Sequence, residues 1–214
     1  MVRRHGKRSC CLINLKKFVY LISPAKINDS FYNDLDKVLT FKNVKFFKLR
    51  LKKTNKIKII ENAKKIIKIT KKHRVKLIIN DDVRIAKITK ADGCHLGQKD
   101  DSILKAKKYL KHKIIGVTCH NSKLLAKIAI KNNVNYIAFG SFNKSRLKPK
   151  AKKANIDILK WGKKSFKKPI VAIGGVNNLN YKKLIKSGAK YIALSSYIWD
   201  NPKLKPEIAI KKFK

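Results

Sequence analysis

Short apolar runs alternate with longer amphipathic segments along the chain from Phe18 onward. The short runs are rich in β-branched and aromatic residues, which favour strands. There are eight such runs, at residues 18–23, 44–50, 75–80, 93–96, 113–119, 136–140, 169–175 and 191–196. Between them, apolar positions recur at a helical period with Lys on the opposite face, most clearly over 57–73, 122–133 and 179–188. Gly188 ends the last of these segments, as a helix C-cap does.

Eight strands alternating with helices predict an α/β fold, a single (β/α)8 TIM barrel over residues 17–214. Residues 1–16 are predicted to be a basic N-terminal extension. The active site of such a barrel lies at the C-terminal ends of its strands, and polar residues or glycines do collect there. They are Arg50, Asn80, Asp81, His95, Thr118, His120, Gly140, Ser141, Gly174, Gly175, Ser195 and Ser196. An open doubly wound sheet would need a glycine-rich first turn, which "LISPAKIND" lacks.

The charge of the chain is extreme, with a formal net charge of +43 over 214 residues. Only seven of the 55 basic residues are Arg, and Lys is spread along every segment, which is typical of a compositional bias on solvated faces. A nucleic-acid-binding module remains an alternative, although it would need clustered Arg and exposed aromatic residues. The four cysteines form no metal-binding spacing and indicate reduced thiols in a cytoplasmic protein. No apolar run is long enough to span a membrane.

Two carboxylates follow neighbouring predicted strands in a chain that has only 12 acidic residues. Asp81 comes directly after the third run, and Asp100 lies four residues past the fourth. Mg²⁺ favours one or two carboxylates together with substrate phosphates, so the pair forms a candidate metal site. Either residue could instead cap a helix, but Asp82 and Asp101 are better placed as N-caps, which leaves Asp81 and Asp100 for the metal.

Two further groups indicate anion binding. Arg50 and Lys52 leave the second run in alternation, so their side chains project to the same side and suit a phosphate or diphosphate. The segments "AIGGVNNLN" and "ALSSYIW" close the last two runs, where barrels often bind a phosphate through backbone amides. His95 is predicted to be a hydrogen-bonded strand residue, whereas His120 is a candidate general acid or base. Together, these residues predict a reaction that transfers a chemical group from or to a diphosphate substrate.

At this point the chain resembles the thiamine-phosphate synthases and their relatives, the thiazole tautomerases. The segment "ADGCHLGQKD" (91–100) carries the resemblance most specifically. Supporting segments are "YLIS", "KLRLK", "IIND", "IIGVTCHN", "NYIAFGS", "PIVAIGGV" and "GAKYIALSSYI", so that the likeness runs from Phe18 to Ile198. It implies a Mg²⁺-dependent transferase of thiamine biosynthesis that joins hydroxymethylpyrimidine diphosphate to thiazole phosphate and releases pyrophosphate. Its partners would be small phosphorylated molecules, with no specific nucleic acid and no membrane, and a homo-oligomer is compatible with it.

The resemblance also implies roles for individual residues. Asp81 and Asp100 match the Mg²⁺ ligands. The residues that match the grip on the pyrimidine diphosphate are Arg50, Lys52, Asn80, Thr118 and Lys148, and all but Asn80 would take part in catalysis. The thiazole-phosphate cradle is matched by Ser145, Gly175, Ser195 and Ser196.

The chain departs from the family pattern in two places. Lys48 stands where the family has Gln, and in "GSFNKSRLK" (140–148) Ser145 keeps one hydroxyl whereas Leu147 loses another. Such a lost hydrogen bond to a charged group costs on the order of 1.5–3 kcal/mol. A divergent paralogue therefore remains an alternative, either a thiazole tautomerase acting through His120 or a phosphate-binding barrel without coupling activity.

Overall fold

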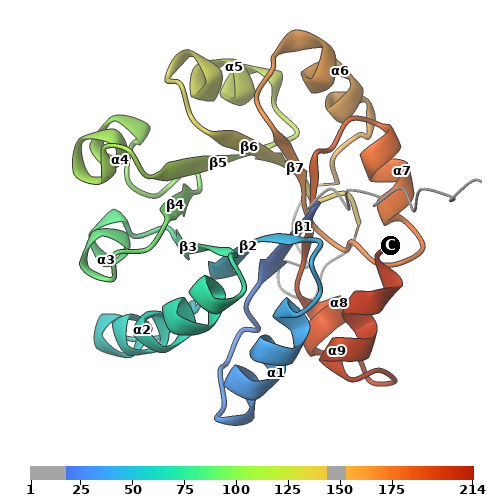
Figure 1. Ribbon diagram of the computed structural model, residues 1–214. Helices are drawn as coiled ribbons and strands as arrows, with labels where there is room; N and C mark the ends of the chain where they lie inside the picture. Colours follow the sequence, from blue (N-terminus) through green and yellow to red (C-terminus); the bar gives the residue numbers. More distant parts are fainter. Residues whose placement is uncertain (1–17, 144–152) are drawn as a thin grey trace, which may run out of the picture.

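The strands of the chain form a closed parallel barrel surrounded by helices (Figure 1). The computed structural model describes residues 18–143 and 153–214. The strands pair in sequence order, and β8 closes the barrel against β1. They are β1 (Val19–Ile22), β2 (Val44–Leu49), β3 (Lys76–Asn80), β4 (Gly93–Leu96), β5 (Ile114–His120), β6 (Tyr136–Phe139), β7 (Ile170–Ala172) and β8 (Tyr191–Leu194). The predicted single (β/α)8 barrel is confirmed, and the predicted extension 1–16 lies outside the described residues.

Every predicted strand is present, although most are shorter than the apolar run that predicts them. The β7 run, predicted over 169–175, is reduced to Ile170–Ala172. Gly174 and Gly175 follow with φ values of 98° and 58°, a left-handed conformation that ends the strand pairing. Only β4 has the predicted bounds. The sequence thus locates the strands, and local backbone geometry decides where each one stops.

Side chains of the strands alternate between two apolar layers. On β1, Val19 and Leu21 belong to the layer between the barrel and its helices, whereas Tyr20 and Ile22 belong to the smaller cluster that fills the barrel interior. Tyr136 reaches the same interior from β6. Burying one large apolar side chain contributes about 1.5–3 kcal/mol, so these two layers stabilise the barrel from both sides.

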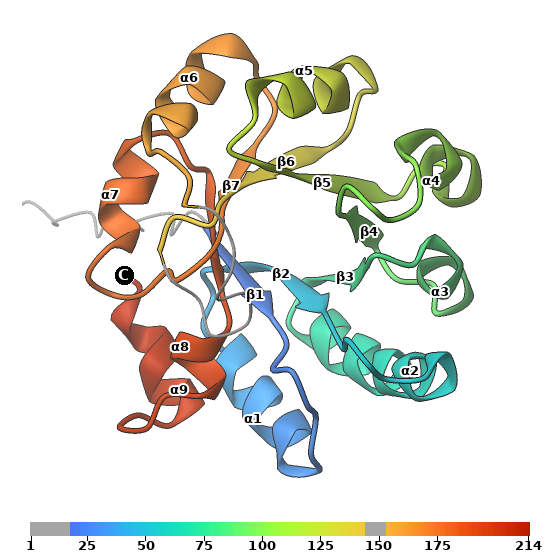
Figure 2. The ribbon, with the colours of Figure 1, turned by 180° about the vertical axis from the view of Figure 1, so that it is seen from behind.

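The helices surround the barrel on all sides, as the view from behind also shows (Figure 2). They are α1 (Ser30–Leu39), α2 (Lys56–Lys72), α3 (Val83–Ile88), α4 (Ile103–Leu110), α5 (Lys123–Lys131), α6 (Asp157–Ser165), α7 (Tyr181–Lys186), α8 (Ser196–Trp199), α9 (Pro206–Ala209) and the 3-10 turn η1 (Ile210–Lys212). The predicted helices at 57–73, 122–133 and 179–188 correspond to α2, α5 and α7. Gly188 follows α7 with φ 122°, as its predicted capping role requires. No helix in the described ranges has the length and apolar character needed to cross a bilayer.

Contacts near the C-terminus hold the last helices against the barrel. The Trp199 side chain donates from Nε1 to the Ile22 carbonyl at 2.7 Å, which ties α8 to the end of β1. Phe213 is fully buried against the rings of Tyr181 and Tyr197. The helices next to the β1 and β8 ends of the barrel are therefore held in place by buried contacts.

Candidate active site

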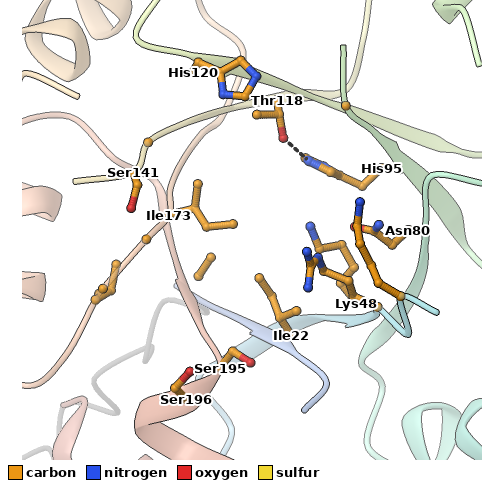
Figure 3. Close-up of a pocket in the computed structure, with 18 of the residues that line it drawn as sticks. Ile22, Lys48, Asn80, His95, Thr118, His120, Ser141, Ile173, Ser195 and Ser196 are labelled. Carbon is orange, nitrogen blue, oxygen red and sulfur yellow. Dashed lines mark hydrogen bonds between the residues drawn. The ribbon is translucent and has the colours of Figure 1, made fainter. Parts of the chain in front are cut away.

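A cavity of about 1300 Å³ opens at the C-terminal ends of the strands. Figure 3 shows Lys48, Asn80 and His95 on one side of it and Ser195 and Ser196 on another. The predicted site residues that line it are Arg50, Lys52, Asn80, Asp81, Asp100, Thr118, Gly175, Ser195 and Ser196. Lys148 and Ser145 fall in 144–152, outside the described residues. The prediction that one barrel mouth collects these groups is confirmed for every described member.

Three cations line the cavity at the end of β2. Lys48, Arg50 and Lys52 alternate along the chain, so all three point to the same opening. Lys48 is only 4% exposed, and its Nζ lies 5.9 Å from the centre of the Tyr20 ring. Arg50 is half-buried and Lys52 is exposed. The cations thus form a row that leads from solvent into the barrel, a field suited to an extended anion.

Ser23 fixes the backbone at this row. Its hydroxyl accepts a hydrogen bond from the Arg50 amide at 2.9 Å and donates to the Arg50 carbonyl at 3.3 Å. Burial lowers the pKa of the Arg50 guanidinium, and the charge of Asp81 acts in the opposite direction. Arg50 remains a cation at any physiological pH, because the pKa of an arginine side chain lies far above that range.

Asp81 and Asp100 lie side by side, next to the cations at the end of β2. Burial raises the pKa of Asp81 most, and a hydrogen bond and the negative charge of Asp100 raise it further. Lys52 opposes this effect, with its Nζ 3.5 Å from Asp81 Oδ2. The Asp100 carboxylate is held in turn by the Gly97 amide, which donates to Oδ2 at 2.6 Å.

The pair fits a divalent cation by its chemistry. Two hard oxygen donors are held close enough to disfavour ionisation of Asp81, and a cation between them would reverse that effect. Asp81 also adopts φ 69°, an uncommon conformation for a residue other than glycine. Within the described ranges, no group of three or more His, Cys, Asp or Glu residues is placed to hold a metal ion. The pair therefore suits a cation that takes its other ligands from substrate or water.

Asp82 and Asp101, which follow Asp81 and Asp100 in the sequence, have different roles. Asp82 caps α3 as predicted, since its carboxylate accepts from the amides of Arg84 and Ile85 at 2.9 Å. The prediction that Asp101 caps α4 is wrong. Ser102 is the N-cap, and its hydroxyl accepts from the Lys105 amide at 3.1 Å. Asp101 instead pairs with the Lys105 ammonium at 2.5 Å, because it lies one residue too early to reach the amides of the first turn.

His95 and Thr118 connect the barrel interior to the cavity. His95 is 3% exposed, and its Nε2 lies 2.7 Å from Thr118 Oγ1 (Figure 3). Its Nδ1 lies 2.9 Å from the Tyr136 hydroxyl, so the prediction of a hydrogen-bonded strand histidine is confirmed. Gln98 donates from Nε2 to the Thr118 carbonyl at 2.5 Å. Thr118 is thereby held at both its side chain and its backbone.

The ends of β7 and β8 form the opposite wall. Asn180 donates from Nδ2 to the Gly175 carbonyl at 2.9 Å, which stabilises the left-handed turn. A Cβ on Gly174 would lie 1.9 Å from Ser141 Oγ, so glycine is required where these two loops meet. The Ser195 hydroxyl donates to the Ser23 carbonyl at 3.1 Å, which links the β8 end to β1.

Several lining residues escaped prediction. They are Lys48, which differs from the family pattern in the sequence, and Lys99, Asn121, Asn177, Tyr197, Asp200 and Asn201. Each of the last six lies a few residues beyond a strand end, in a loop or short helix. The position of the strand ends was a usable signal for them, but their side chains carry no motif of their own.

A comparison with known families gives one decisive match. The model described as thiamine monophosphate synthase matches residues 19–198, almost the whole barrel. The chain belongs to the thiamine monophosphate synthase family. The resemblance inferred from "ADGCHLGQKD" and its companions, and with it the expectation of a transferase of thiamine biosynthesis, is thereby confirmed.

Individual members of the family agree with this match. The chain is 54% identical to the thiamine-phosphate synthase of Pelagibacter ubique (strain HTCC1062) over 200 residues, which cover 93% of this chain and 97% of that one. It is 32% identical to the thiamine-phosphate synthase of Clostridium acetobutylicum, over 92% of this chain and 94% of that one. The structure of thiamine phosphate pyrophosphorylase from Pyrococcus furiosus superposes with a TM-score of 0.82 at 25% identity, covering 92% and 94% of the two chains.

Proposed function

We propose that this cavity joins hydroxymethylpyrimidine diphosphate to thiazole phosphate, giving thiamine phosphate and pyrophosphate. The observation that carries the proposal is the row of cations from Lys48 to Lys52 next to the Asp81–Asp100 pair in one mouth of a barrel of this family. That arrangement suits a substrate with an extended anionic group and a divalent cation.

The pyrimidine diphosphate would lie against the β2 to β5 side of the mouth. Arg50 can bind two phosphate oxygens at once, and Lys52 supplies a mobile positive charge at the rim. Asn80 and Thr118 add neutral hydrogen-bonding groups between them. The family pattern assigns the same role to Lys148, which lies outside the described residues.

Asp81 and Asp100 would hold Mg²⁺. The close contact of the two carboxylates, which raises the pKa of Asp81, supports this assignment. Mg²⁺, when bound, supplies positive charge that neutralises a diphosphate. Lys52 lies 3.5 Å from Asp81 and shares that side of the cavity, so substrate and metal ligands would meet at one edge.

The thiazole phosphate would occupy the opposite wall. The backbone amides near Gly175 and around Ser195 and Ser196 are the groups that would bind its phosphate. The family pattern adds Ser145, which lies outside the described residues. Binding of the thiazole phosphate against β7 and β8 would leave its ring nitrogen facing the pyrimidine across the cavity.

The residues would act mainly by electrostatic stabilisation. The bond between the pyrimidine methylene carbon and the diphosphate oxygen breaks, and its electron pair leaves with the diphosphate. The thiazole nitrogen then gives its lone pair to the methylene carbon, which forms the new carbon–nitrogen bond. Arg50 and Lys52 both line the cavity, so their charges would stabilise the leaving oxygens with little reorganisation as charge develops.

The test is pyrophosphate release and thiamine phosphate formation by the purified protein with both substrates, with and without Mg²⁺. Wild-type protein should form both products only with Mg²⁺, and Asp100→Asn should lose most of this activity. Asp101→Asn is the matched control, because Asp101 is the adjacent acid but pairs with Lys105 and does not line the cavity. Binding of both substrates without product, or equal losses in the two variants, would overturn the proposal.

A further inference from the structure

A chain of four polar side chains crosses the interior of the barrel and ends at the cavity. The Tyr20 and Tyr136 hydroxyls lie 2.7 Å apart, the Tyr136 hydroxyl lies 2.9 Å from His95 Nδ1, and His95 Nε2 lies 2.7 Å from Thr118 Oγ1. These groups come from β1, β6, β4 and β5. Tyr20, Tyr136 and His95 are each at most 3% exposed. His95 and Thr118 both line the cavity, and Thr118 is the more exposed of the two.

The protons along this chain can be counted. Each hydroxyl donates once, and a neutral imidazole has one N–H and one acceptor nitrogen. Burial raises the pKa of Tyr20 and of Tyr136, so both keep their protons. A buried donor without an acceptor is costly, and in the described part of the chain Tyr136 is the acceptor that Tyr20 reaches.

The need for an acceptor for the Tyr20 proton sets the direction of all the hydrogen bonds in this row of side chains. If Tyr20 donates to Tyr136, then Tyr136 donates to Nδ1 of His95, and the imidazole proton lies on Nε2 and points to Thr118. The reverse direction would leave the Tyr20 proton buried with no acceptor among the described residues. The forward direction gives the Tyr20, Tyr136 and His95 protons an acceptor each.

We propose that Tyr136 and His95 are positioning residues that make Thr118 a hydrogen-bond donor toward the cavity. With the proton of His95 on Nε2, the Thr118 oxygen accepts from inside the barrel and its own proton is directed outward. In the reverse order Thr118 would offer only lone pairs to the cavity and would repel a phosphate oxygen. Gln98 holds the Thr118 backbone, so the orientation of the hydroxyl is the remaining degree of freedom. The identity of the anion, the diphosphate of the pyrimidine substrate, rests on the proposed function.

The direct test is the tautomer of His95, read from long-range ¹H–¹⁵N correlations of the ¹⁵N-labelled full-length protein without substrate. The His95 signals are assigned by their loss in His95→Gln. We expect the neutral ring to be protonated at Nε2, and to stay so in Tyr20→Phe, because Tyr136 still has His95 as its acceptor. Tyr136→Phe should shift the ring toward the Nδ1-protonated form. Protonation at Nδ1 in the wild type, or no change in Tyr136→Phe, would overturn the proposal.

Tyr191→Phe is the matched control for the tautomer experiment. Tyr191 is a barrel-interior tyrosine on β8 that packs against Phe46 but does not belong to the four hydrogen-bonded side chains. Its hydroxyl can be removed with a similar effect on packing, and the His95 spectrum should not change. A shift as large as that in Tyr136→Phe would mean that packing alone sets the tautomer, which would overturn the proposal.

Kinetics test the consequence for Thr118. Thr118→Val should lower kcat/KM for the diphosphate substrate about ten- to a hundredfold, as expected for a lost hydrogen bond to a charged group. Tyr136→Phe should lower it about three- to tenfold, and in the Thr118→Val background it should add less than about twofold. Full multiplication of the two losses would overturn the positioning role. If the wild type forms no product, the proposed function fails, and the tautomer experiment still decides this inference.

Discussion

The carboxylates of Asp81 and Asp100 meet across the ends of β3 and β4, where burial and the Asp100 side chain together raise the pKa of Asp81. Such a contact destabilises the fold when both groups are charged. We expect Asp100→Asn to raise the free energy of unfolding in EDTA, by on the order of 1 kcal/mol for a like-charge pair near solvent. The asparagine oxygen can still accept from the Gly97 amide, so the loop should keep its conformation.

The same substitution should have the opposite effect on metal binding. Wild-type protein should gain thermal stability as Mg²⁺ is added, because a ligand that binds only the folded state stabilises it, and Asp100→Asn should lose most of this gain. Thermal unfolding with EDTA and with a Mg²⁺ titration measures both effects. Asp101→Asn serves as the control, and a stability gain from Mg²⁺ that survives in Asp100→Asn would remove Asp100 from the ligand set.

Lys48 should contribute to the binding of the diphosphate. It is a nearly buried cation whose position the family fills with Gln, so Lys48→Gln should preserve the shape of the site. We expect the KM for the diphosphate substrate to rise about three- to tenfold and kcat to change little, because the lost attraction acts on the bound substrate as a whole. Lys45→Gln makes the same charge change on β2 away from the cavity and should leave KM unaltered. Equal KM values in the two variants would show that Lys48 makes no such contribution.

The start of α4 offers a test of capping chemistry. Ser102→Ala removes the hydroxyl that accepts from the Lys105 amide and should cost about 0.5–2 kcal/mol of stability in urea unfolding. Asp101→Ala removes a partly exposed pair with Lys105 and should cost at most about 1 kcal/mol. The reverse ranking would make Asp101 the more important residue at this helix end.

The fold and the outline of the site were predictable because they follow from local pattern. Apolar runs of strand length locate β1 to β8, and parallel strands carry the polar residues at their ends, such as Asn80 and Thr118, to one mouth. The capping error had a local cause as well, because Asp101 and Ser102 are both good cap residues, and their order relative to the first helical turn decides between them.

Contacts across the barrel could not be predicted in this way. Tyr20 and Tyr136 are 116 residues apart, and each is an ordinary aromatic residue in an apolar run. Their hydroxyls meet only because the barrel closes. The burial of Lys48 has the same origin, since in the sequence it is one lysine among many, and only the pleat of β2 turns it toward the interior.

Asp36 should make stability depend on pH through a contact between α1 and α2. Hydrogen bonds from Lys72 and then from His73 lower the pKa of Asp36 below its ordinary 3.8. Because the folded pKa is the lower one, this stabilisation is present above about 3.8 and is lost as the pH falls through the folded value. Asp36→Asn should therefore lower Tm at pH 7. The free energy of unfolding should fall by up to about 1 kcal/mol, because the contact is exposed, and the difference from the wild type should shrink below pH 3.8.

The control for this pH dependence is Asp34→Asn, on the same helix, for which no ion pair is found among the described residues. Its Tm should stay close to that of the wild type at both pH values. A difference between Asp36→Asn and the wild type that persists unchanged at low pH would mean that the Asp36 charge is not its cause.

Gly116 should be essential for the position of the Tyr136 ring. A Cβ at Gly116 would lie 1.9 Å from Tyr136 Cζ, and that ring is fully buried and hydrogen-bonded to Tyr20 and His95. Gly116→Ala should cost about 1–3 kcal/mol, as overpacking of a core does, and should also disturb His95 and hence Thr118. Gly162→Ala, whose nearest contact is the tip of the Ile170 side chain at 2.8 Å, should cost less and leave activity intact. Urea unfolding and pyrophosphate release measure the two effects, and full activity in a destabilised Gly116→Ala would separate the ring position from catalysis.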